Sequence, residues 1–342
     1  TSASSTDIPI SKLFQHPKPR KMDKDLPSTA ATSTASDPEP WHNRLNHANQ
    51  ELINKTRNAS TGIPDNVIHP PDCKACQVGK CRRRKYNRYK KGELHAHTSA
   101  KYDPFECIEV DVSGPYTTLM LPHGDRYTLA AIDRNTSCSA FAGAKQKGGD
   151  ESVSILEDYL LTVPKKPSIV RTDAGAEFCN TLFQTKVKMI DAVHKPAPAK
   201  ESNQLAKVEA HFRELYRAAR SMIKLAHLPD KFGLYAMKHA HYVRQLKPTG
   251  DHPMSPYEAL TGKKPDLTHL RTFGCVAYVK DQKDKLPKFS ERAYPVIFVG
   301  YDKNDSYIFW NPISKREIRR RKAWFHEDQP GGGLLNREYY RR

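Results

Sequence analysis

Three acidic residues stand where a metal-dependent phosphoryl-transfer site would need them. Asp111 lies near the end of an apolar, strand-like run, Asp173 directly follows another, and 35 residues, numbers 174 to 208, separate Asp173 from Glu209. Phosphoryl transfer of this kind uses two divalent cations about 4 Å apart, which activate the attacking oxygen and stabilise the leaving oxygen. Carboxylates are the ligands that Mg²⁺ prefers in proteins. Asp111, Asp173 and Glu209 are therefore the candidate catalytic residues and ligands of two Mg²⁺ (or Mn²⁺) ions, with Asp111 bridging.

Each of these acids has an ordinary interpretation when it is taken alone. Aspartate at a strand end commonly belongs to a turn, and glutamate on a helix is commonly solvated. The order and the spacing of the three together favour the catalytic interpretation. The acids that could be confused with them are Glu109, Asp133 and Glu177 and, as alternatives to Glu209, Glu201 and Glu214. Because Glu109 and Asp111 share one strand face, we expect Glu109 near the site without being a ligand.

A second group of residues could bind a structural metal ion. His42 and His47 are separated by four residues, and Cys73-x-x-Cys76 follows after 25 more. Two imidazoles and two thiolates form the ligand set of a closed tetrahedral zinc site. One Zn²⁺ can contribute on the order of 10 kcal/mol to the folding of such a small segment. His69 and Cys81 are nearby alternatives, and a chance grouping in a His-rich chain is the competing interpretation.

The charge of the chain points to a polyanionic partner. Its 342 residues include 56 Lys and Arg but only 38 Asp and Glu, which gives a formal net charge of +18. Such an excess attracts nucleic acid through counterion release. A membrane surface is the competing polyanion, but no amphipathic anchor helix accompanies the basic residues. We also expect no membrane span and no signal peptide, and the seven cysteines fit metal binding in a reducing compartment.

Three groups of cations could hold nucleic-acid phosphates. Tyr86 and Tyr89 lie among the cations of the first group, in the run 80–91, and could stack on bases. Each group also has the simpler interpretation of a solvated face. The three groups are Lys80, Arg82, Arg83, Arg84, Lys85 and Arg88, then Arg213, Arg217, Arg220 and Lys224, and finally Arg319, Arg320 and Arg321 within the run 315–322.

The elements that must position these residues follow from periodicity. β-branched, aromatic and small residues predict three successive strands and a fourth before Asp173, with a helix that Asp150 could cap between them. Apolar spacings of 3 and 4 predict a long helix from about 203 to 225 that carries Glu209, with the second cation group on an adjacent stripe. The predicted strands are 105–112, 126–133 and 137–144, a further helix is 231–246, and later β pieces are 273–279, 296–301, 307–310 and 317–325.

These elements divide the chain into segments. Residues 1–40 are rich in Ser, Thr, Ala and Pro and form a predicted disordered tail or linker. The predicted order after that is a zinc-binding domain at 41–92, a catalytic core at 98–250, a connector at 251–272, a small basic β module at 273–328 and a tail at 329–342.

Several sequence blocks, in order, resemble the integrases of copia-type (Pseudoviridae) LTR retrotransposons. The similar blocks are WHNRLNH at 41–47, CKACQVGK at 73–80, VDVSGP at 110–115, RTDAGAEF at 171–178, PYEALTGKKP at 256–265, LRTFGC at 270–275 and FVGY at 298–301. The resemblance covers about residues 41–328. The family has an Asn-Gly-x-Ala-Glu block around its glutamate, whereas this chain reads LAKVE at 205–209, so the turn before Glu209 is built differently.

The resemblance implies an α/β catalytic core of the RNase H-like, retroviral integrase type, a small helical zinc-binding N-terminal domain and a small β-rich, basic C-terminal module. It implies a polynucleotidyl transferase that joins 3′-hydroxyl ends of element cDNA to host target DNA, with 3′-end processing as the water-driven counterpart. Expected partners are those two DNAs, further copies of the chain, because synapsis of two ends needs more than one protomer, and reverse transcriptase as a polyprotein neighbour. The expected location is the nucleus, with a cytoplasmic virus-like-particle stage.

Two other functions compete with this interpretation. A domesticated DNA-binding protein would keep the fold without the reaction, and it predicts loss of an acid or a zinc ligand, neither of which is lost. An RNase H-type nuclease usually needs a fourth acid and would not call for the His/Cys group.

Overall fold

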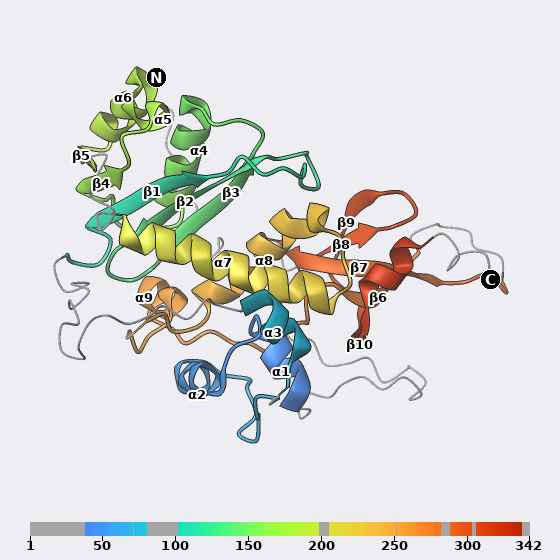
Figure 1. Ribbon diagram of the computed structural model, residues 1–342. Helices are drawn as coiled ribbons and strands as arrows, with labels where there is room; N and C mark the ends of the chain where they lie inside the picture. The colour runs from blue at the N-terminus through green and yellow to red at the C-terminus, as the bar shows by residue number, and fades with distance from the viewer. Residues whose placement is uncertain are drawn as a thin grey trace, which may run out of the picture.

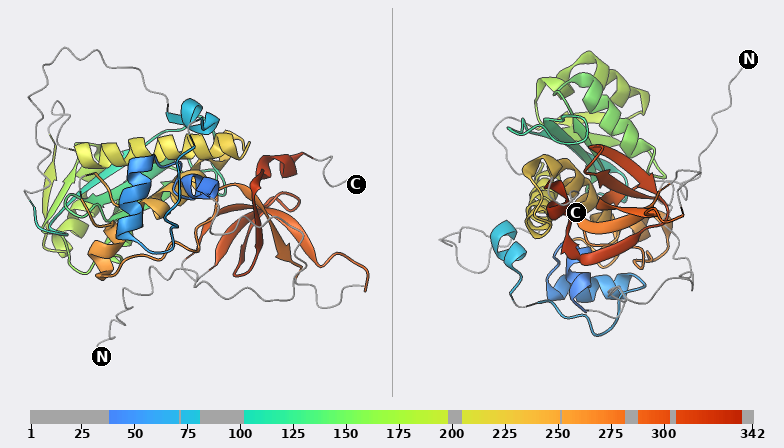
Figure 2. Two further views of the ribbon diagram at one scale, coloured as in Figure 1. Left: turned by 90° about the horizontal axis from the view of Figure 1, so that it is seen from below. Right: turned by 90° about the vertical axis from the view of Figure 1, so that its right-hand side faces the viewer.

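The computed structural model describes residues 38–70, 72–80, 102–197, 205–250, 252–281, 288–302 and 306–336. A mixed sheet with helices on both faces forms the centre, and a small helical N-terminal unit and an antiparallel C-terminal module pack around it (Figures 1 and 2). Of the predicted tail 1–40, residues 1–37 lie outside the described residues. Within the described ranges, no helix combines the length and the apolar content needed to cross a bilayer.

The central sheet has the order β3-β2-β1-β4-β5. Strands β1 (Cys107–Ser113), β2 (Tyr127–Asp133) and β3 (Ser139–Ala144) form an antiparallel meander. Strand β4 (Ile169–Thr172) runs parallel to β1, and β5 (Val193–Pro196) runs parallel to β4. These directions fit the predicted RNase H-like core.

Helices cover both faces of this sheet. Helices α4 (Gly149–Leu160), α5 (Ala176–Cys179) and α6 (Thr181–Met189) lie on one face, whereas α7 (Ala206–Leu225) and α8 (Gly233–Gln245) lie on the other (Figure 1). The N-cap of α4 is Gly148, and the predicted cap Asp150 lies in the first turn instead. A short 3₁₀ turn, η3 (Asp230–Phe232), leads into α8.

Alternation along β1 explains how one strand serves both faces. Ile108 and Val110 are fully buried in the core formed with α4 and α6. The residues that alternate with them, Glu109, Asp111 and Ser113, therefore face α7. Helix α7 buries the apolar stripe that its spacing predicted, with Val208, Phe212, Leu215, Ala219 and Met222 all inside. It begins at Ala206 rather than near 203, and residues 198–204 lie outside the described part of the chain.

The N-terminal unit consists of α1 (Pro38–Arg44), α2 (Gln50–Ala59) and α3 (Lys74–Lys80). Its core around Trp41, Leu45 and Ile53 continues into α8 and the connector. Helix α3 lies directly on α7, because a Cβ on Gly79 would stand 2.3 Å from Ser221 Oγ. Arg220 Nε donates a hydrogen bond of 3.2 Å to the Gly79 carbonyl, which fixes the same contact.

The C-terminal module is a curved antiparallel sheet of order β10-β6-β7-β8-β9. The predicted strand 317–325 is two strands, β9 and β10, which lie at opposite edges of this sheet. The module also continues past 328, because Gly331 N donates 2.8 Å to the Gly274 carbonyl and Leu334 is 2% exposed. Its elements are β6 (Cys275–Lys280), β7 (Ala293–Tyr301), β8 (Tyr307–Asn311), β9 (Arg316–Arg320), β10 (Trp324–Pro330) and the 3₁₀ turn η4 (Gly331–Leu335).

The connector is partly helical and joins all three parts. Helix α9 (Pro256–Thr261) is capped by Ser255 Oγ, which accepts from Glu258 N at 3.1 Å. Beyond it, Thr272 donates to Glu327 of β10 through its amide (2.8 Å) and its hydroxyl (2.7 Å). The same carboxylate pairs with Arg44 of α1 at 2.5 Å, and both side chains are only 4% exposed. This buried pair therefore ties the N-terminal unit to the C-terminal module.

We predict that Arg44→Met lowers the free energy of unfolding by about 3 kcal/mol, because it removes the closer cation from the buried Glu327 carboxylate and leaves Arg271, 4.0 Å away, as its remaining partner. Urea unfolding followed by fluorescence would measure this loss. The control is Lys186→Met, which breaks the more exposed Lys186–Glu157 pair and should cost less than about 1 kcal/mol. Equal losses of unfolding free energy in the two variants would show that the buried Arg44–Glu327 pair stabilises the protein no more than the more exposed pair does.

Candidate functional site

The three predicted acids come from three adjoining elements. Asp111 lies on β1, Asp173 follows β4 directly, and Glu209 lies in the first turn of α7. Strands β1 and β4 are parallel neighbours, so Asp111 and Asp173 lie toward the same end of the sheet. Helix α7 packs against β1 and brings Glu209 to this end. The structure therefore gathers acids that are far apart in the sequence.

The negative charges of Asp173 and Glu209 act on Asp111. The pKa of Asp111 is raised from 3.8 to about 7, mainly by burial and further by the negative charges of Asp173 and Glu209. A hydrogen bond from Val112 N to Asp111 Oδ1, 2.8 Å long, opposes this rise only in part. A cation would favour the charged form of such a crowded carboxylate. The donor set and its unmet negative charge thus fit divalent metal ions.

The other two acids are held more loosely. Asp173 Oδ1 accepts from Gly175 N at 3.0 Å, which fixes the turn after β4. The side chain of Glu209 is 45% exposed, and its nearest cation is Arg213 at 3.8 Å, one helical turn later. Their carboxylates therefore retain free oxygen lone pairs for a ligand.

Glu109, expected near the site, has a structural task that the sequence did not reveal. Its side chain is fully buried, and Oε2 accepts hydrogen bonds from Lys207 N (3.0 Å) and Val208 N (2.9 Å) at the start of α7. Its other oxygen pairs with Arg134. Two residues beyond Asp111 on the same face, Ser113 Oγ lies 2.6 Å from the Tyr216 hydroxyl of α7.

Two more of the alternative acids, Asp133 and Glu214, are engaged elsewhere. Asp133 Oδ2 accepts from the amide (2.6 Å) and hydroxyl (2.8 Å) of Thr136. Glu214 Oε2 accepts from Arg244 Nε of α8 at 2.8 Å. Glu201 lies outside the described residues.

Glu177 forms part of a cavity beside the acids. Its Oε1 lies 2.7 Å from Lys147 Nζ, and this pairing is the main reason why the pKa of Lys147 is raised. The charges of Asp173 and Asp111 raise it further. The cavity has a volume of about 570 Å³ and is lined by Lys147, Gly148, Gly149, Gly175, Ala176, Glu177 and Asn180. Lys147 is thus a cation next to the acidic cluster that sequence reasoning missed.

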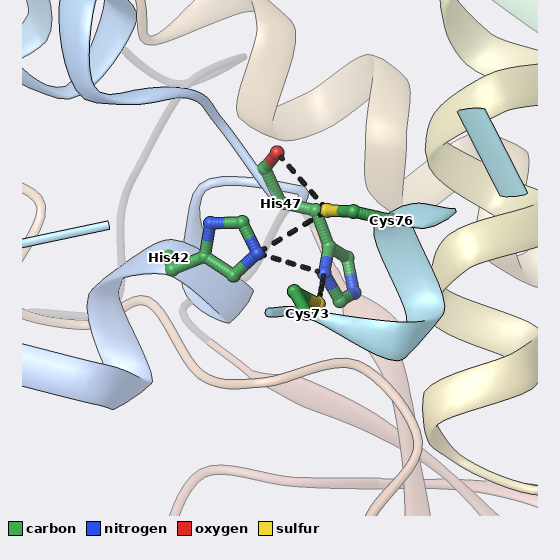
Figure 3. Close-up of side chains that lie close together, drawn as sticks. All are labelled: His42, His47, Cys73 and Cys76. Carbon is green, nitrogen blue, oxygen red and sulfur yellow. Dashed lines mark hydrogen bonds between the residues drawn. The ribbon is translucent and has the colours of Figure 1, made fainter. Parts of the chain in front are cut away.

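The four predicted zinc ligands converge on one point (Figure 3). His47 Nδ1 lies 3.2 Å from His42 Nε2 and 3.4 Å from Cys73 Sγ, and Cys76 Sγ lies 3.4 Å from His42 Nε2. Edges of a tetrahedron built from zinc–nitrogen and zinc–sulfur bonds are about 3.3–3.8 Å long. These side chains could therefore hold one Zn²⁺ through His42 Nε2, His47 Nδ1 and the two sulfur atoms.

Local structure orients the two imidazoles for this task. His42 Nδ1 donates to the Ala48 carbonyl at 2.8 Å, which leaves Nε2 free as a ligand. Asn46 and His47 both have φ of 59°, and this left-handed pair turns the chain sharply after α1. Burial lowers the pKa of His42 to about 4 and that of His47 well below its usual value, so both rings are neutral, as metal binding requires. His69 packs edge-on against His42, with ring centres 4.5 Å apart, but is not among the four convergent residues.

The predicted cations differ in what surrounds them. Lys80 Nζ donates to the His47 carbonyl, and Arg220 Nε to that of Gly79, so both hold the N-terminal unit. Arg319 pairs with Asp302 at 3.1 Å and with Glu317 at 2.6 Å. Arg213, Lys224 and Arg321 are exposed, while Arg217 and Arg320 are half-buried. Cys81, Arg82, Arg83, Arg84, Lys85, Tyr86, Arg88 and Tyr89 lie outside the described residues.

Comparison with known sequences gives the chain its relatives. Residues 275–335 match the family described as the retroviral polymerase SH3-like domain. The retrovirus-related Pol polyprotein from transposon TNT 1-94 of Nicotiana tabacum is 24% identical over 84% of this chain and 21% of its own length. That from transposon RE1 of Arabidopsis thaliana is 24% identical over 88% of this chain and 20% of its own length. The chain therefore spans about a fifth of the length of these curated relatives.

Comparison with solved structures finds integrases. The catalytic core of HTLV-2 integrase in complex with magnesium has a TM-score of 0.36 at 14% identity, covering 46% of this chain and 97% of that one. A chain of the simian T-cell lymphotropic virus intasome has a TM-score of 0.39 at 15% identity, covering 66% and 76%.

The sequence relatives define the class. The homologues of this chain are retrovirus-related Pol polyproteins of plant copia-like transposons. More particularly, the chain contains a retroviral polymerase SH3-like domain, which forms its C-terminal module.

The raised pKa of Asp111 predicts how stability depends on pH. A carboxyl whose pKa is higher in the folded than in the unfolded protein stabilises the fold fully below about pH 4 and loses this contribution as the pH rises to about 7. In Mg²⁺-free buffer, the wild type should therefore lose stability between about pH 5 and about pH 8, and Asp111→Asn should lose less.

Urea unfolding at the two pH values measures this difference. The control is Glu157→Gln, because Glu157 lies outside the acidic cluster and its side chain is 50% exposed and paired with Lys186. The same pH dependence in the wild type and Asp111→Asn would show that the carboxyl is not perturbed.

Proposed function

We propose that this chain is the integrase segment of a copia-type retroelement polyprotein and that it joins 3′-hydroxyl ends of element cDNA to phosphodiesters of host DNA. The observation that carries the proposal is the acidic cluster at one end of an RNase H-like sheet, where burial and then the negative charges of Asp173 and Glu209 raise the pKa of Asp111. The Pol polyprotein relatives and the SH3-like domain support it.

Asp111, Asp173 and Glu209 would hold two Mg²⁺ or Mn²⁺ ions. When bound, these ions would activate the attacking oxygen and stabilise the leaving oxygen of an in-line displacement. The chain itself would contribute position and charge, which supply most of the catalysis in phosphoryl transfer. Lys147, beside Asp111 and Asp173, is placed to meet a phosphate close to the acids. Attack by water in place of the hydroxyl would give 3′-end processing.

DNA would bind mainly through its backbone. The formal charge of +18 gives long-range attraction, and Arg213 and Lys224 are exposed along α7, beginning one turn after Glu209. Contacts of this kind position the DNA without reading its sequence. Two DNA ends must be held together for concerted joining, so we propose that the active form contains more than one copy of the chain and that it acts in the nucleus.

A strand-transfer assay with paired DNA ends and Mg²⁺ or Mn²⁺ tests this proposal. Asp173→Asn and Glu209→Gln should each reduce joining by at least about 100-fold, because a catalytic metal ion stabilises the transition state by several kcal/mol. The matched control is Glu214→Gln on the same helix, whose carboxylate faces Arg244 of α8.

No joining by the wild type, or no effect of Glu209→Gln, would exclude the integrase function. Cleavage of RNA–DNA hybrids without any joining would favour an RNase H-type nuclease instead.

We further propose that His42, His47, Cys73 and Cys76 bind one structural Zn²⁺. Purified protein should contain about one zinc per chain, and Cys73→Ser should lose the zinc together with much of the roughly 10 kcal/mol that such a site contributes to folding. Elemental analysis and thermal unfolding measure the two effects.

Cys179→Ser is the control for the zinc experiment, because Cys179 is exposed and distant from the tetrad in sequence. Zinc-free wild-type protein, or a Cys73→Ser variant with unchanged thermal stability, would rule out the site.

A further inference from the structure

One face of strand β1 is directed toward helix α7 at three alternate positions. Glu109 binds the start of the helix, Asp111 lies near Glu209, and Ser113 contacts Tyr216. The residues alternate by two along β1, so all three point to the same side. The acid pair thus lies between two direct hydrogen-bonded contacts that join the strand to the helix.

The first backbone N–H groups of α7 need a hydrogen-bond acceptor, and Glu109 provides it. The first N–H groups of a helix have no partner within it, and a side chain just before the helix commonly accepts from them. Here that position is Leu205, which makes no side-chain capping bond. The buried Glu109 carboxylate instead accepts from Lys207 N and Val208 N, at 3.0 and 2.9 Å. Its negative charge also interacts favourably with the helix dipole.

Glu209 is the residue directly after these two amides. Any shift of the first turn of α7 would therefore carry the Glu209 backbone with it. Because its side chain is 45% exposed, the surroundings of the side chain do little to hold the carboxylate in place. The hydrogen bond from Val208 N to Glu109, one residue before Glu209, links the first turn of α7 to β1, the strand that bears Asp111.

We propose that Glu109 is a positioning residue for the metal site: by binding the N-terminus of α7 from β1, it sets the separation between Glu209 and Asp111. The proposal rests on the proposed function in that these acids bind divalent cations. Glu109 thereby takes the place of the side-chain cap that Leu205 does not provide at the start of α7. Loss of groups that orient metal ligands typically costs about 10- to 100-fold in metal affinity.

Three variants of the full-length chain test the role of Glu109. Glu109→Ala removes the acceptor and should weaken Mn²⁺ binding by about 10-fold or more. Glu109→Asp keeps the charge but draws the acceptor back by about one 1.5 Å bond, so it should weaken binding even if the alanine variant fails to fold. Glu109→Gln retains an acceptor oxygen for both amides but loses the ion pair with Arg134, so it should recover part of the affinity that Glu109→Ala loses.

Two readouts separate positioning from general stability. Mn²⁺ binding is measured by the electron paramagnetic resonance of free Mn²⁺, and hydrogen exchange is followed in the first turn of α7. Exchange there should accelerate in Glu109→Ala and Glu109→Asp. The matched control is Asp133→Asn, a buried acid of the same sheet that binds Thr136. This control should lower thermal stability without changing Mn²⁺ affinity.

Unchanged Mn²⁺ affinity in a folded Glu109→Asp protein would overturn the positioning role, as would an equal loss in Asp133→Asn. Failure of the proposed function has a different signature. If the wild type joins no DNA ends but the Mn²⁺ and hydrogen-exchange effects persist, the integrase function falls and the positioning role stands.

Discussion

The packing of α7 is the constraint on which the rest of this structure depends. One side of the helix is buried against the sheet and the C-terminal module through a shared apolar core. Another side of α7 packs against α3 of the N-terminal unit, and this contact is so close that a Cβ on Gly79 would not fit. Glu209 begins this same helix, so the fold that sets the His/Cys tetrad against the core also sets the third acid beside β1. Moving α7 would disturb every candidate site at once.

Charge is distributed in a way that suits an anionic substrate. The chain carries a formal net charge of +18, yet burial and, to a smaller extent, the neighbouring charges of Asp173 and Glu209 raise the pKa of Asp111 to about 7 at the end of the sheet. A polyanion drawn to the surface would meet a local negative cluster that favours divalent cations. Lys147 and Arg213 lie at the border between the two regions. Metal ions bound between the carboxylates and the phosphates of the polyanion would offset the repulsion between these two sets of negative charges.

Sequence reasoning found what depends on spacing and missed what depends on long-range contacts. The His/Cys tetrad and the three acids could be proposed because ligand types and intervals carry the information. The structure brings the ligand atoms of the tetrad within 4.8 Å of one another, and it places the acids where Asp173 and Glu209 act on the charge of Asp111. The capping of α7 by Glu109 joins residues 98 and 99 positions apart, and the Arg44–Glu327 pair spans 283, so no local pattern announces either. The run of cations at 315–322 likewise gave no sign that the predicted strand 317–325 divides into β9 and β10.

The integrase function that we propose requires Asp111, Asp173 and Glu209 to form one metal site for joining DNA. A structure determined with paired DNA ends and Mn²⁺, in which anomalous scattering locates the ions, tests it most directly. We expect two Mn²⁺ ions among these three carboxylates, next to the 3′ end of the DNA. Ions bound elsewhere, or DNA ends held away from this end of the sheet, would contradict it.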